Sequence, residues 1–511
     1  MDRSATADRP SDTDQGGAAG PPHVVVVGGG IAGLAAAAFL SGAAAFFSGA
    51  AAFFSGAAGS SGPRARVTVL EASERFGGKL RAGEVGGVAV DLGAESMLAR
   101  RPEAVELARA VGLAEELEPP QTAKAAFWTR GALRPMPTGH VMGVPGDLAA
   151  LERTGVLSAE GLARARHDLE LPPTEVGDDV SIGDWVGARV GREVVDRLVE
   201  PLLGGVYAGH ADRISLRAAV PQLLPVAQSG GSLLEGVAAL QRRAAEAAPA
   251  APQPVFQGIR GGIGRLPLAV ADAVRAAGAD LCPGTAVRSL RRTGDGWRLV
   301  VRDTAGEREL AADAVVLAVP APVAARLLAD EAPAAAAELG TVEYAGMALV
   351  TMAFRRSELP GRPAGSGFLV PPVDGRTIKA STFSSNKWGW LDRSAPESFL
   401  LRTSVGRHGE AADLELPDEE LVARSLADLR EAVGLRTAPY AAEVTRWESG
   451  LPQYPVGHLD RVRRIRQDVA RHGSLALCGA VYEGVGIPAC IASARQAADA
   501  VTAALTAVGT R

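Results

Sequence analysis

A glycine-rich segment near the N-terminus has the spacing of a dinucleotide-binding loop. It lies between a β-branched run, His23 to Val27, and an Ala-rich stretch that ends at Leu40. In such a strand–turn–helix unit, glycines permit a tight turn and a close approach of the backbone to a diphosphate, and the helix N-terminus supplies free N–H groups. The spacing alone is weak evidence, but its place between a predicted strand and a predicted helix strengthens it. The residues predicted to bind the dinucleotide are Gly28, Gly29, Gly30, Ile31, Ala32 and Gly33.

Glu71 ends a second predicted strand, 66–70, where a carboxylate can accept hydrogen bonds from ribose hydroxyls. Such an acid should follow the last glycine by about 20 residues, but Glu71 follows Gly33 by 38. A repeat fills the interval, with SGAAAFF at 41–47 and 48–54 and SGAA at 55–58. Removing residues 41–61 restores a separation of 17. We therefore predict that Glu71 binds ribose and that the repeat is a dispensable low-complexity insertion. A membrane-binding segment is the alternative, but the repeat has no Lys or Arg to meet anionic lipid.

The residues after Glu71 add a glycine pair and a cation to the predicted site. The run is Ala72-Ser-Glu-Arg-Phe-Gly77-Gly78-Lys79. Two glycines allow the backbone to wrap a diphosphate, and Lys79 can neutralise it. The pattern resembles the dinucleotide-binding extension of the FAD-dependent amine oxidase superfamily. The resemblance implies FAD rather than a nicotinamide cofactor, with contacts from Ala72, Gly78 and Lys79.

A second glycine-rich turn, 479–488, precedes an Ala-rich stretch near the C-terminus. A helix N-terminus there could place N–H groups against the flavin pyrimidine and favour negative charge on the reduced ring; an ordinary strand–helix turn is the alternative. The amino-acid sequence of this turn resembles the C-terminal signature of protoporphyrinogen and coproporphyrinogen oxidases. Segments 91–96, 135–139, 201–209, 257–266 and 450–455 resemble the same family. The resemblance implies further FAD contacts at Gly93, Ala94, Glu95, Ser96, Val287, Ala480, Val485, Gly486 and Ile487.

The resemblance also implies flavin-based chemistry, with no catalytic side chain required and molecular oxygen as the acceptor. Gly367, Leu369 and Lys124 match the family's substrate cavity. Segments 93–108 and 124–145 resemble the members that oxidise coproporphyrinogen III, which carries four propionates and so calls for several cations. Lys387, in an aromatic-rich run, and Arg402 are the candidates, followed by Lys124 and Arg130; a residue of this type, taken alone, is more often a solvated surface charge. The expected partners are the porphyrinogen, oxygen and a downstream ferrochelatase.

Three other functions stay open from the sequence. The same machinery could oxidise protoporphyrinogen IX. Another amine-oxidase-type reaction could act on an amine or a polyene. A flavoprotein could also bind porphyrin as a carrier without turnover.

The composition excludes some classes of function. The chain has 511 residues, of which 47% are hydrophobic and 22% charged, and a net charge of −5 gives no field for nucleic-acid binding. Cys282, Cys478 and Cys490 form no CxxC, which indicates a reducing compartment without an iron–sulfur site. No metal motif and no clean apolar span of about 20 residues is present. We expect a cytoplasmic protein without a transmembrane segment.

The length predicts more than one domain. We expect an α/β fold in which the chain visits a Rossmann-like FAD-binding domain several times, with an inserted α+β substrate domain and a helical subdomain. The expected boundaries are a disordered tail at 1–20, the FAD-binding domain at 21–100, 253–325 and 445–511, a helical subdomain at 101–200, and the substrate domain at 201–252 and 326–444.

Overall fold

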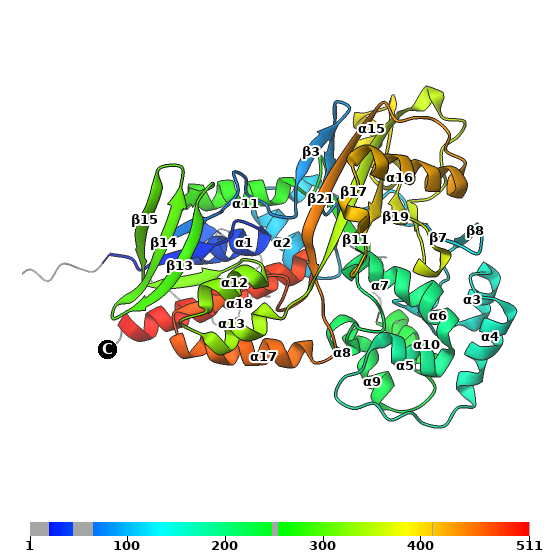
Figure 1. Cartoon of the computed structure of the whole chain (residues 1–511), viewed down its shortest axis with the longest axis horizontal. Coiled ribbons are helices and arrows are strands. Elements are labelled where there is room, and N and C mark those ends of the chain that lie inside the picture. Colours follow the sequence, from blue (N-terminus) through cyan, green and yellow to red (C-terminus); the bar gives the residue numbers. More distant parts are fainter. Residues whose placement is uncertain (1–19, 44–64, 248–253, 411, 510–511) are drawn as a thin grey trace, which may run out of the picture.

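The computed structural model describes residues 20–43, 65–247, 254–410 and 412–509. These residues form three parts: a domain around a parallel sheet, a second and larger sheet beside it, and a cluster of helices below that sheet (Figure 1). The α/β fold class is thereby confirmed. The tail at 1–19 and the repeat from residue 44 onward lie outside the described residues, as do the predictions made for them.

The first part is built on a five-stranded parallel sheet whose strands come from distant parts of the chain. In spatial order they are β12 (Asp280–Cys282), β2 (Arg66–Leu70), β1 (His23–Val27), β16 (Ala314–Leu317) and β22 (Leu475–Leu477). The valines of β1 are buried on both faces, as a central parallel strand requires.

Helices cover both faces of this sheet, so its strands are enclosed. Val24 and Val26 pack toward α1 (Ile31–Leu40), α11 (Arg265–Ala276) and α18 (Ile487–Gly509), with α2 (Pro102–Ala110) alongside. Val25 and Val27 pack on the opposite side with α12 (Ala321–Leu328), α13 (Pro333–Gly340) and α17 (His458–Val469). An antiparallel meander, β13 (Ala286–Thr293), β14 (Gly296–Asp303) and β15 (Gly306–Ala312), extends the domain.

The second part is a seven-stranded sheet, antiparallel except where β18 pairs with β7. Its order is β21 (Ala441–Pro452), β17 (Tyr344–Arg355), β20 (Ser398–Val405), β19 (Ile378–Thr382), β18 (Gly367–Leu369), β7 (Ala125–Thr129) and β8 (Ala132–Pro135). Helix α16 (Asp418–Val433) covers one face through Leu421 and Leu429. The other face turns toward the first domain, where β3 (Ala82–Val85), β4 (Val88–Asp91) and α15 (Gly389–Ser394) pack on it.

The third part is a helical cluster with its own core. Its helices are α3 (Leu148–Thr154), α4 (Ala159–Arg166), α5 (Ile182–Val190), α6 (Arg192–Val194), a π-helical turn (Val195–Val199), α7 (Glu200–Tyr207), α8 (Leu216–Ala219), α9 (Leu224–Gln228) and α10 (Leu233–Glu246). Short strands β9 (His140–Val141) and β10 (Val144–Pro145) border it, and β5 (Met97–Leu98), β11 (Phe256–Ile259) and β6 (Leu117–Glu118) form a small sheet between the other parts.

Two segments differ from the expected domain assignment. Residues 125–135, expected in the helical subdomain, form β7 and β8 of the seven-stranded sheet. Residues 201–246, expected with the substrate sheet, pack into the helical cluster through Leu203, Leu216 and Leu233. For the first segment long-range pairing decides the placement, because β7 meets β18, about 240 residues later, and local periodicity carries no information about such a partner.

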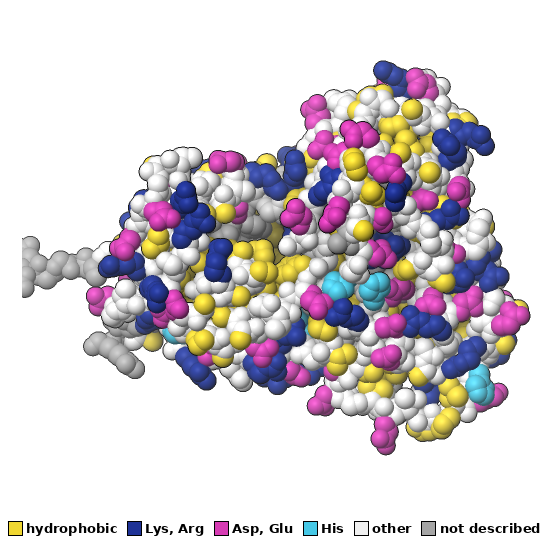
Figure 2. All heavy atoms as spheres, in the orientation of Figure 1, with side chains coloured by type: hydrophobic (Ala, Val, Ile, Leu, Met, Phe, Trp, Pro, Cys, Tyr) yellow, Lys and Arg dark blue, Asp and Glu magenta, His cyan; other side chains and the backbone are white. Residues whose placement is uncertain are grey.

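The described surface agrees with the composition. On the face shown in Figure 2, Lys and Arg side chains are interspersed with Asp and Glu rather than gathered in one field. Among the helices of the described residues, none is both long and apolar enough to cross a membrane.

Candidate functional site

The Gly28–Gly33 loop joins the C-terminal end of β1 to α1, as predicted from its spacing. The Gly28 N–H donates to the Leu70 carbonyl at 2.8 Å, and Gly28 has φ +109°, a conformation that favours glycine. A Cβ at position 33 would lie 1.8 Å from the Gly28 oxygen, so the loop packs against the first turn of α1. A Cβ at Gly30 would meet nothing within 4 Å. The loop is therefore tight on its inner side and open where a diphosphate would approach.

Glu71 lies beside this loop at the end of β2. Its Oε2 accepts from the Gly29 N–H at 2.7 Å, and its Oε1 accepts from the N–H and hydroxyl of Ser73, both at 2.8 Å. The carboxylate is only partly buried, and Oε2, which accepts one bond, can accept a further one. Val287 packs in the same core as Leu70, next to this end of the sheet. The position suits a ribose ligand, while Ala72 is exposed beside it.

The Gly77–Gly78 pair closes the loop from the other side. The Gly77 N–H donates to the Gly29 carbonyl at 2.8 Å, and a Cβ on Gly78 would lie 3.2 Å from the Gly30 Cα. Burial lowers the pKa of Lys79 to about 8. Its Nζ lies 5.7 Å from the centre of the Tyr344 ring, and in the described part of the chain no carboxylate pairs with it. A partly desolvated, unmatched cation beside an open glycine loop fits a diphosphate.

The second glycine-rich turn lies where the three parts of the molecule meet. Ala480 packs on the core of the parallel-sheet domain, Val485 packs on the core of the helical cluster, and α18 begins at Ile487. The Tyr454 hydroxyl at the end of β21 donates to the Ala480 carbonyl. The first turn of α18 lies near the first loop, because Cys490 in that turn is close enough to Lys79 to influence its pKa. The free N–H groups at the start of α18 are therefore on the side of the predicted nucleotide site.

Glu95, predicted as an FAD contact, has a further role as the counterion of two cations. It follows β4, is 7% exposed, and forms ion pairs with Lys387 at 2.7 Å and with Arg402 at 3.1 Å. Arg402 also donates to the Gly93 carbonyl at 2.7 Å. Burial works against ionisation of Glu95, but Arg402 and Lys387 outweigh it and hold its pKa below the usual value. Two cations face one carboxylate, so the cluster carries an excess positive charge.

The pKa of nearby Asp91 is shifted in the opposite direction. Burial raises its pKa to about 6, although its oxygens accept from the N–H groups of Ile263 and Gly264, both at 2.9 Å. Asp91 therefore fixes the turn before α11, and with a pKa of about 6 it is mostly ionised at neutral pH and loses its charge in mild acid.

The structure brings the predicted substrate residues together only in part. Lys387 and Arg402 share Glu95, and Leu369 of β18 packs against the helical cluster, where a Cβ on Gly205 would lie 3.7 Å from it. Gly367 has φ +138°, and a Cβ there would lie 2.0 Å from the Ser381 oxygen, so it serves the sheet.

The two other candidate cations lie apart from this cluster. Lys124 is exposed and forms no ion pair with a described residue. Arg130 pairs with Glu193 of the helical cluster at 3.3 Å. Neither residue is joined to Lys387 or Arg402 by a described contact.

Sequence reasoning missed the counterion role of Glu95 and the role of Tyr454. An acid within the segment 91–96 is a signal for the first, since an acid amid apolar and small residues needs a partner when buried. The aromatic residue in 450–455 is a signal for the second, because a buried tyrosine hydroxyl needs an acceptor.

Comparison with known proteins places these features in a family. The family described as flavin containing amine oxidoreductase matches residues 31–502. Coproporphyrinogen III oxidase of Bacillus subtilis (strain 168) is 32% identical, with 94% of this chain and 98% of the relative covered. The coproporphyrinogen III oxidase of Mycobacterium tuberculosis (strain ATCC 25618 / H37Rv) is 35% identical, with 95% and 98% covered. Protoporphyrinogen oxidase of Macaca fascicularis is 29% identical, with 94% and 98% covered.

Solved structures agree with this placement. A protein from Exiguobacterium sp. 255-15, provisionally described as a protoporphyrinogen oxidase, is 32% identical and superposes with a TM-score of 0.79, covering 94% of this chain and 99% of that one. Putrescine oxidase bound to putrescine has a TM-score of 0.63 at 17% identity, with 95% and 99% covered, and shows the shared fold alone.

Proposed function

Because this chain belongs to the porphyrinogen oxidase family of flavin-containing amine oxidoreductases, we propose that it oxidises coproporphyrinogen III to coproporphyrin III. The observation that carries the proposal is identity of 32% and 35% to coproporphyrinogen III oxidases along nearly the whole chain, against 29% to the Macaca protoporphyrinogen oxidase over a similar length. The cofactor is FAD, as the family and both glycine-rich turns require.

The chain's own residues account for binding of the cofactor. The Gly28–Gly33 loop and Lys79 would hold the diphosphate, Glu71 the ribose, and the start of α18 the flavin pyrimidine. Bound FAD supplies two-electron acceptor chemistry. The protein's task is then to place a porphyrinogen carbon next to that acceptor and to exclude water.

The excess positive charge of the Lys387–Glu95–Arg402 cluster supports a polyanionic substrate. A propionate could bind the free positive charge without leaving Glu95 unmatched. Lys387 also lies 5.1 Å from the centre of the Trp388 ring and 5.9 Å from that of the Phe256 ring, so aromatic side chains stand beside this cation. Three two-electron oxidations with three O2 would release three H2O2 and give the aromatic product. We place the reaction in the cytoplasm, ahead of a ferrochelatase.

The test offers coproporphyrinogen III and protoporphyrinogen IX, prepared anaerobically, side by side to the purified holoprotein in air. Porphyrin fluorescence and peroxide are followed. We expect faster turnover of coproporphyrinogen and about one H2O2 per two electrons removed. Preference for protoporphyrinogen would contradict the substrate assignment, and no oxidation of either would contradict the activity.

A variant of Lys387 provides a second test of the substrate assignment. Lys387→Met leaves Glu95 paired with Arg402, and we expect it to raise the KM for coproporphyrinogen more than for protoporphyrinogen, since the latter carries fewer carboxylates. Equal effects on the two substrates would contradict a propionate contact at Lys387.

A further inference from the structure

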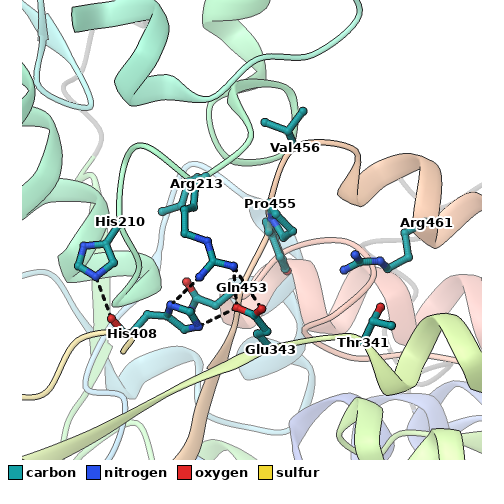
Figure 3. A pocket seen from close by; sticks show the side chains of 11 residues that line it. His210, Arg213, Thr341, Glu343, His408, Gln453, Pro455, Val456 and Arg461 are labelled. Atoms are coloured by element: carbon teal, nitrogen blue, oxygen red, sulfur yellow. Dashed lines mark hydrogen bonds and ion pairs between the residues drawn. The ribbon is translucent and has the colours of Figure 1, made fainter. Parts of the chain in front are cut away.

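Two loops from different parts of the molecule meet at a pocket of about 270 Å³ (Figure 3). One loop follows α7 and carries His210 and Arg213, and the other follows β20 and carries His408. Glu343, beside the start of β17, completes the charged group in Figure 3. The pocket therefore marks a contact between the helical cluster and the seven-stranded sheet.

The bonds of His210 define its protonation. Its Nδ1 lies 2.9 Å from Oε1 of Glu200, and its Nε2 lies 2.8 Å from the carbonyl oxygen of His408. Glu200 Oε2 accepts from the Ala211 N–H at 2.6 Å, so both oxygens of this carboxylate are bound to the loop that follows α7. A neutral imidazole has one N–H and cannot donate to both oxygens, so His210 satisfies both bonds as an imidazolium. The bond to Glu200 outweighs the cost of burial and raises the pKa of His210 above its usual value.

A backbone hydrogen bond joins the same two loops a second time. The His408 N–H donates to the Ala208 carbonyl at 2.7 Å, while its carbonyl accepts from His210. Ala208 has φ +50°, a left-handed conformation that a residue other than glycine keeps only where its surroundings hold it. Residue 408 thus holds the end of α7 at two points.

The second loop also binds residues next to β18, the strand with Leu369, which we take as the predicted wall of the substrate cavity (the substrate wall). Arg407 donates to the Val370 carbonyl at 3.3 Å, directly after β18, and Lys379 of β19 donates to the Gly406 carbonyl at 2.5 Å. Helix α7 contacts β18 and β19, and Leu369 of β18 lies against α7 near Gly205. A continuous series of contacts therefore runs from Glu200 and His210 to Leu369.

We propose that His210 is a positioning residue that, as an imidazolium, holds α7 against β18 and so sets the width of the porphyrinogen cavity. Loss of its proton removes one of the two bonds and loosens that wall. This inference rests on the proposed function, because it takes the space beside Leu369 as the substrate cavity.

The charged groups around His210 favour a change of protonation at this residue. Glu200 on α7 and Glu410 on the second loop attract its proton. The His408 ring, 6.5 Å away, binds Glu343 through Nε2 at 2.9 Å, and Arg213 binds the same carboxylate at 2.9 Å. Burial lowers the pKa of His408. Arg213 and Glu343 thus match each other in charge, while burial lowers the pKa of Lys379, which binds Gly406 of the same loop, to about 7.

The sign of the effect follows from the direction of the shift. A histidine whose pKa is raised by folding contributes its bond below the ordinary pKa and loses it as pH rises through the folded value. We expect the KM for coproporphyrinogen to rise about threefold between about pH 6 and about pH 9, with kcat changing less, since an imidazole that is one-third exposed gives a modest effect.

The experiment combines a titration with kinetics. Nitrogen-15 histidine labelling of the holoprotein follows His210, assigned by its loss in His210→Gln, and KM and kcat are measured over the same pH range. His210→Gln keeps one donor, so its KM should be independent of this pH step and equal the high-pH value of the wild type. Glu200→Gln should move the step to lower pH. His167→Gln, which removes an exposed histidine paired with Glu170 at 3.0 Å, is the matched control and should keep the wild-type profile.

The outcomes separate this inference from the proposed function. A His210 pKa at or below the ordinary value, or a His210→Gln variant with the wild-type pH dependence of KM, would overturn the positioning role. Wild-type protein without porphyrinogen oxidation would overturn the proposed function, yet the titration would still report whether His210 is charged. Flavin absorbance and circular dichroism of each variant show that it is folded, and Glu200→Gln supplies the test if His210→Gln is not.

Discussion

At the scale of single residues, the site depends on which charges are matched. Glu95 has two cations, Lys79 has none among the described residues, and Asp91 is held by backbone N–H groups instead. These differences set the directions of their pKa shifts, lowered for Glu95 and Lys79 and raised for Asp91. The sequence predicted Lys387 and Arg402 as a cationic pair, but it could not show that Glu95, about 300 residues earlier, would join them.

Removal of the Glu95 charge should destabilise the protein. In Glu95→Gln, two cations that retain 17% and 14% exposure lose their counterion. We expect a loss of about 2–4 kcal/mol in the free energy of unfolding at neutral pH. Because the Glu95 pKa is lowered by folding, its contribution is present above the ordinary value of 4.5 and is lost as pH falls below it. The difference between variant and wild type, measured by urea unfolding, should therefore shrink in acid.

A surface pair provides the comparison for this substitution. Glu152 lies 3.8 Å from Arg166, and both side chains are more than half exposed. Glu152→Gln should change stability by about 0–1 kcal/mol. A Glu95→Gln variant as stable as Glu152→Gln at neutral pH would show that the buried cluster does not need its carboxylate.

At the scale of elements, sequence patterns were most informative where chemistry and secondary structure coincide. The strand 23–27, the loop 28–33 and the strand 66–70 were predicted at the positions where β1, the loop and β2 lie. The reason is that a parallel strand buried on both faces and a glycine loop both leave local signatures. The contact of Tyr454 with Ala480 leaves no such signature, since it joins two turns through tertiary packing.

Alanine substitutions at two loop glycines should separate folding from cofactor binding. A Cβ at Gly33 clashes with the Gly28 oxygen, so Gly33→Ala should lose about 1–3 kcal/mol of apoprotein stability along with FAD. A Cβ at Gly30 meets open space, so Gly30→Ala should unfold like the wild-type apoprotein, within about 0.5 kcal/mol, but bind FAD about tenfold more weakly. Apoprotein melting and FAD fluorescence titration measure the two effects. Normal FAD affinity in Gly30→Ala would show that the diphosphate does not pass there.

Shortening the interrupted βαβ unit tests the insertion. Ser41 and Ala43 are buried, so the deletion should begin after Ala43 and remove 44–61. We expect the shortened protein to keep its flavin, measured as the absorbance ratio of flavin to protein, and its turnover, because α1 and β2 retain their packing. Loss of flavin on deletion would show that the repeat takes part in the nucleotide site.

At the scale of the whole molecule, several polar contacts join the helical cluster to the seven-stranded sheet, and two of them lie close to β18 in the structure. One is the His210–His408 contact, and the other lies around Arg197 of the π-helical turn. Arg197 donates to the Thr129 hydroxyl of β7 at 2.7 Å and to Asp374, which follows β18, at 3.2 Å. Both reach the segment just after β18, the strand that carries Gly367 and Leu369: Arg407, next to His408, binds the Val370 carbonyl, and Arg197 binds Asp374. The sequence could not predict this arrangement, because it assigned β7 to the helical part and had no signal for its pairing with β18.

The Arg197 contact should therefore govern how cooperatively the two parts unfold. In Arg197→Met, the hydroxyl of Thr129 keeps Asp374 as a partner at 2.6 Å, but Asp374 loses its cation and the helical cluster loses this one of its bonds to the sheet. We expect a loss of about 1–3 kcal/mol, seen in calorimetry as an earlier, broader transition and in hydrogen exchange as faster exchange in α5 to α7. Arg192→Met is the matched control: Arg192 is 52% exposed, and its partners Asp196 and Asp212 both lie in the helical cluster, so the transition should keep its width. Equal broadening in the two variants would mean that Arg197 stabilises the helical cluster itself rather than its junction with the sheet. Of the two contacts, only the one between His210 and His408 could then position β18 against α7.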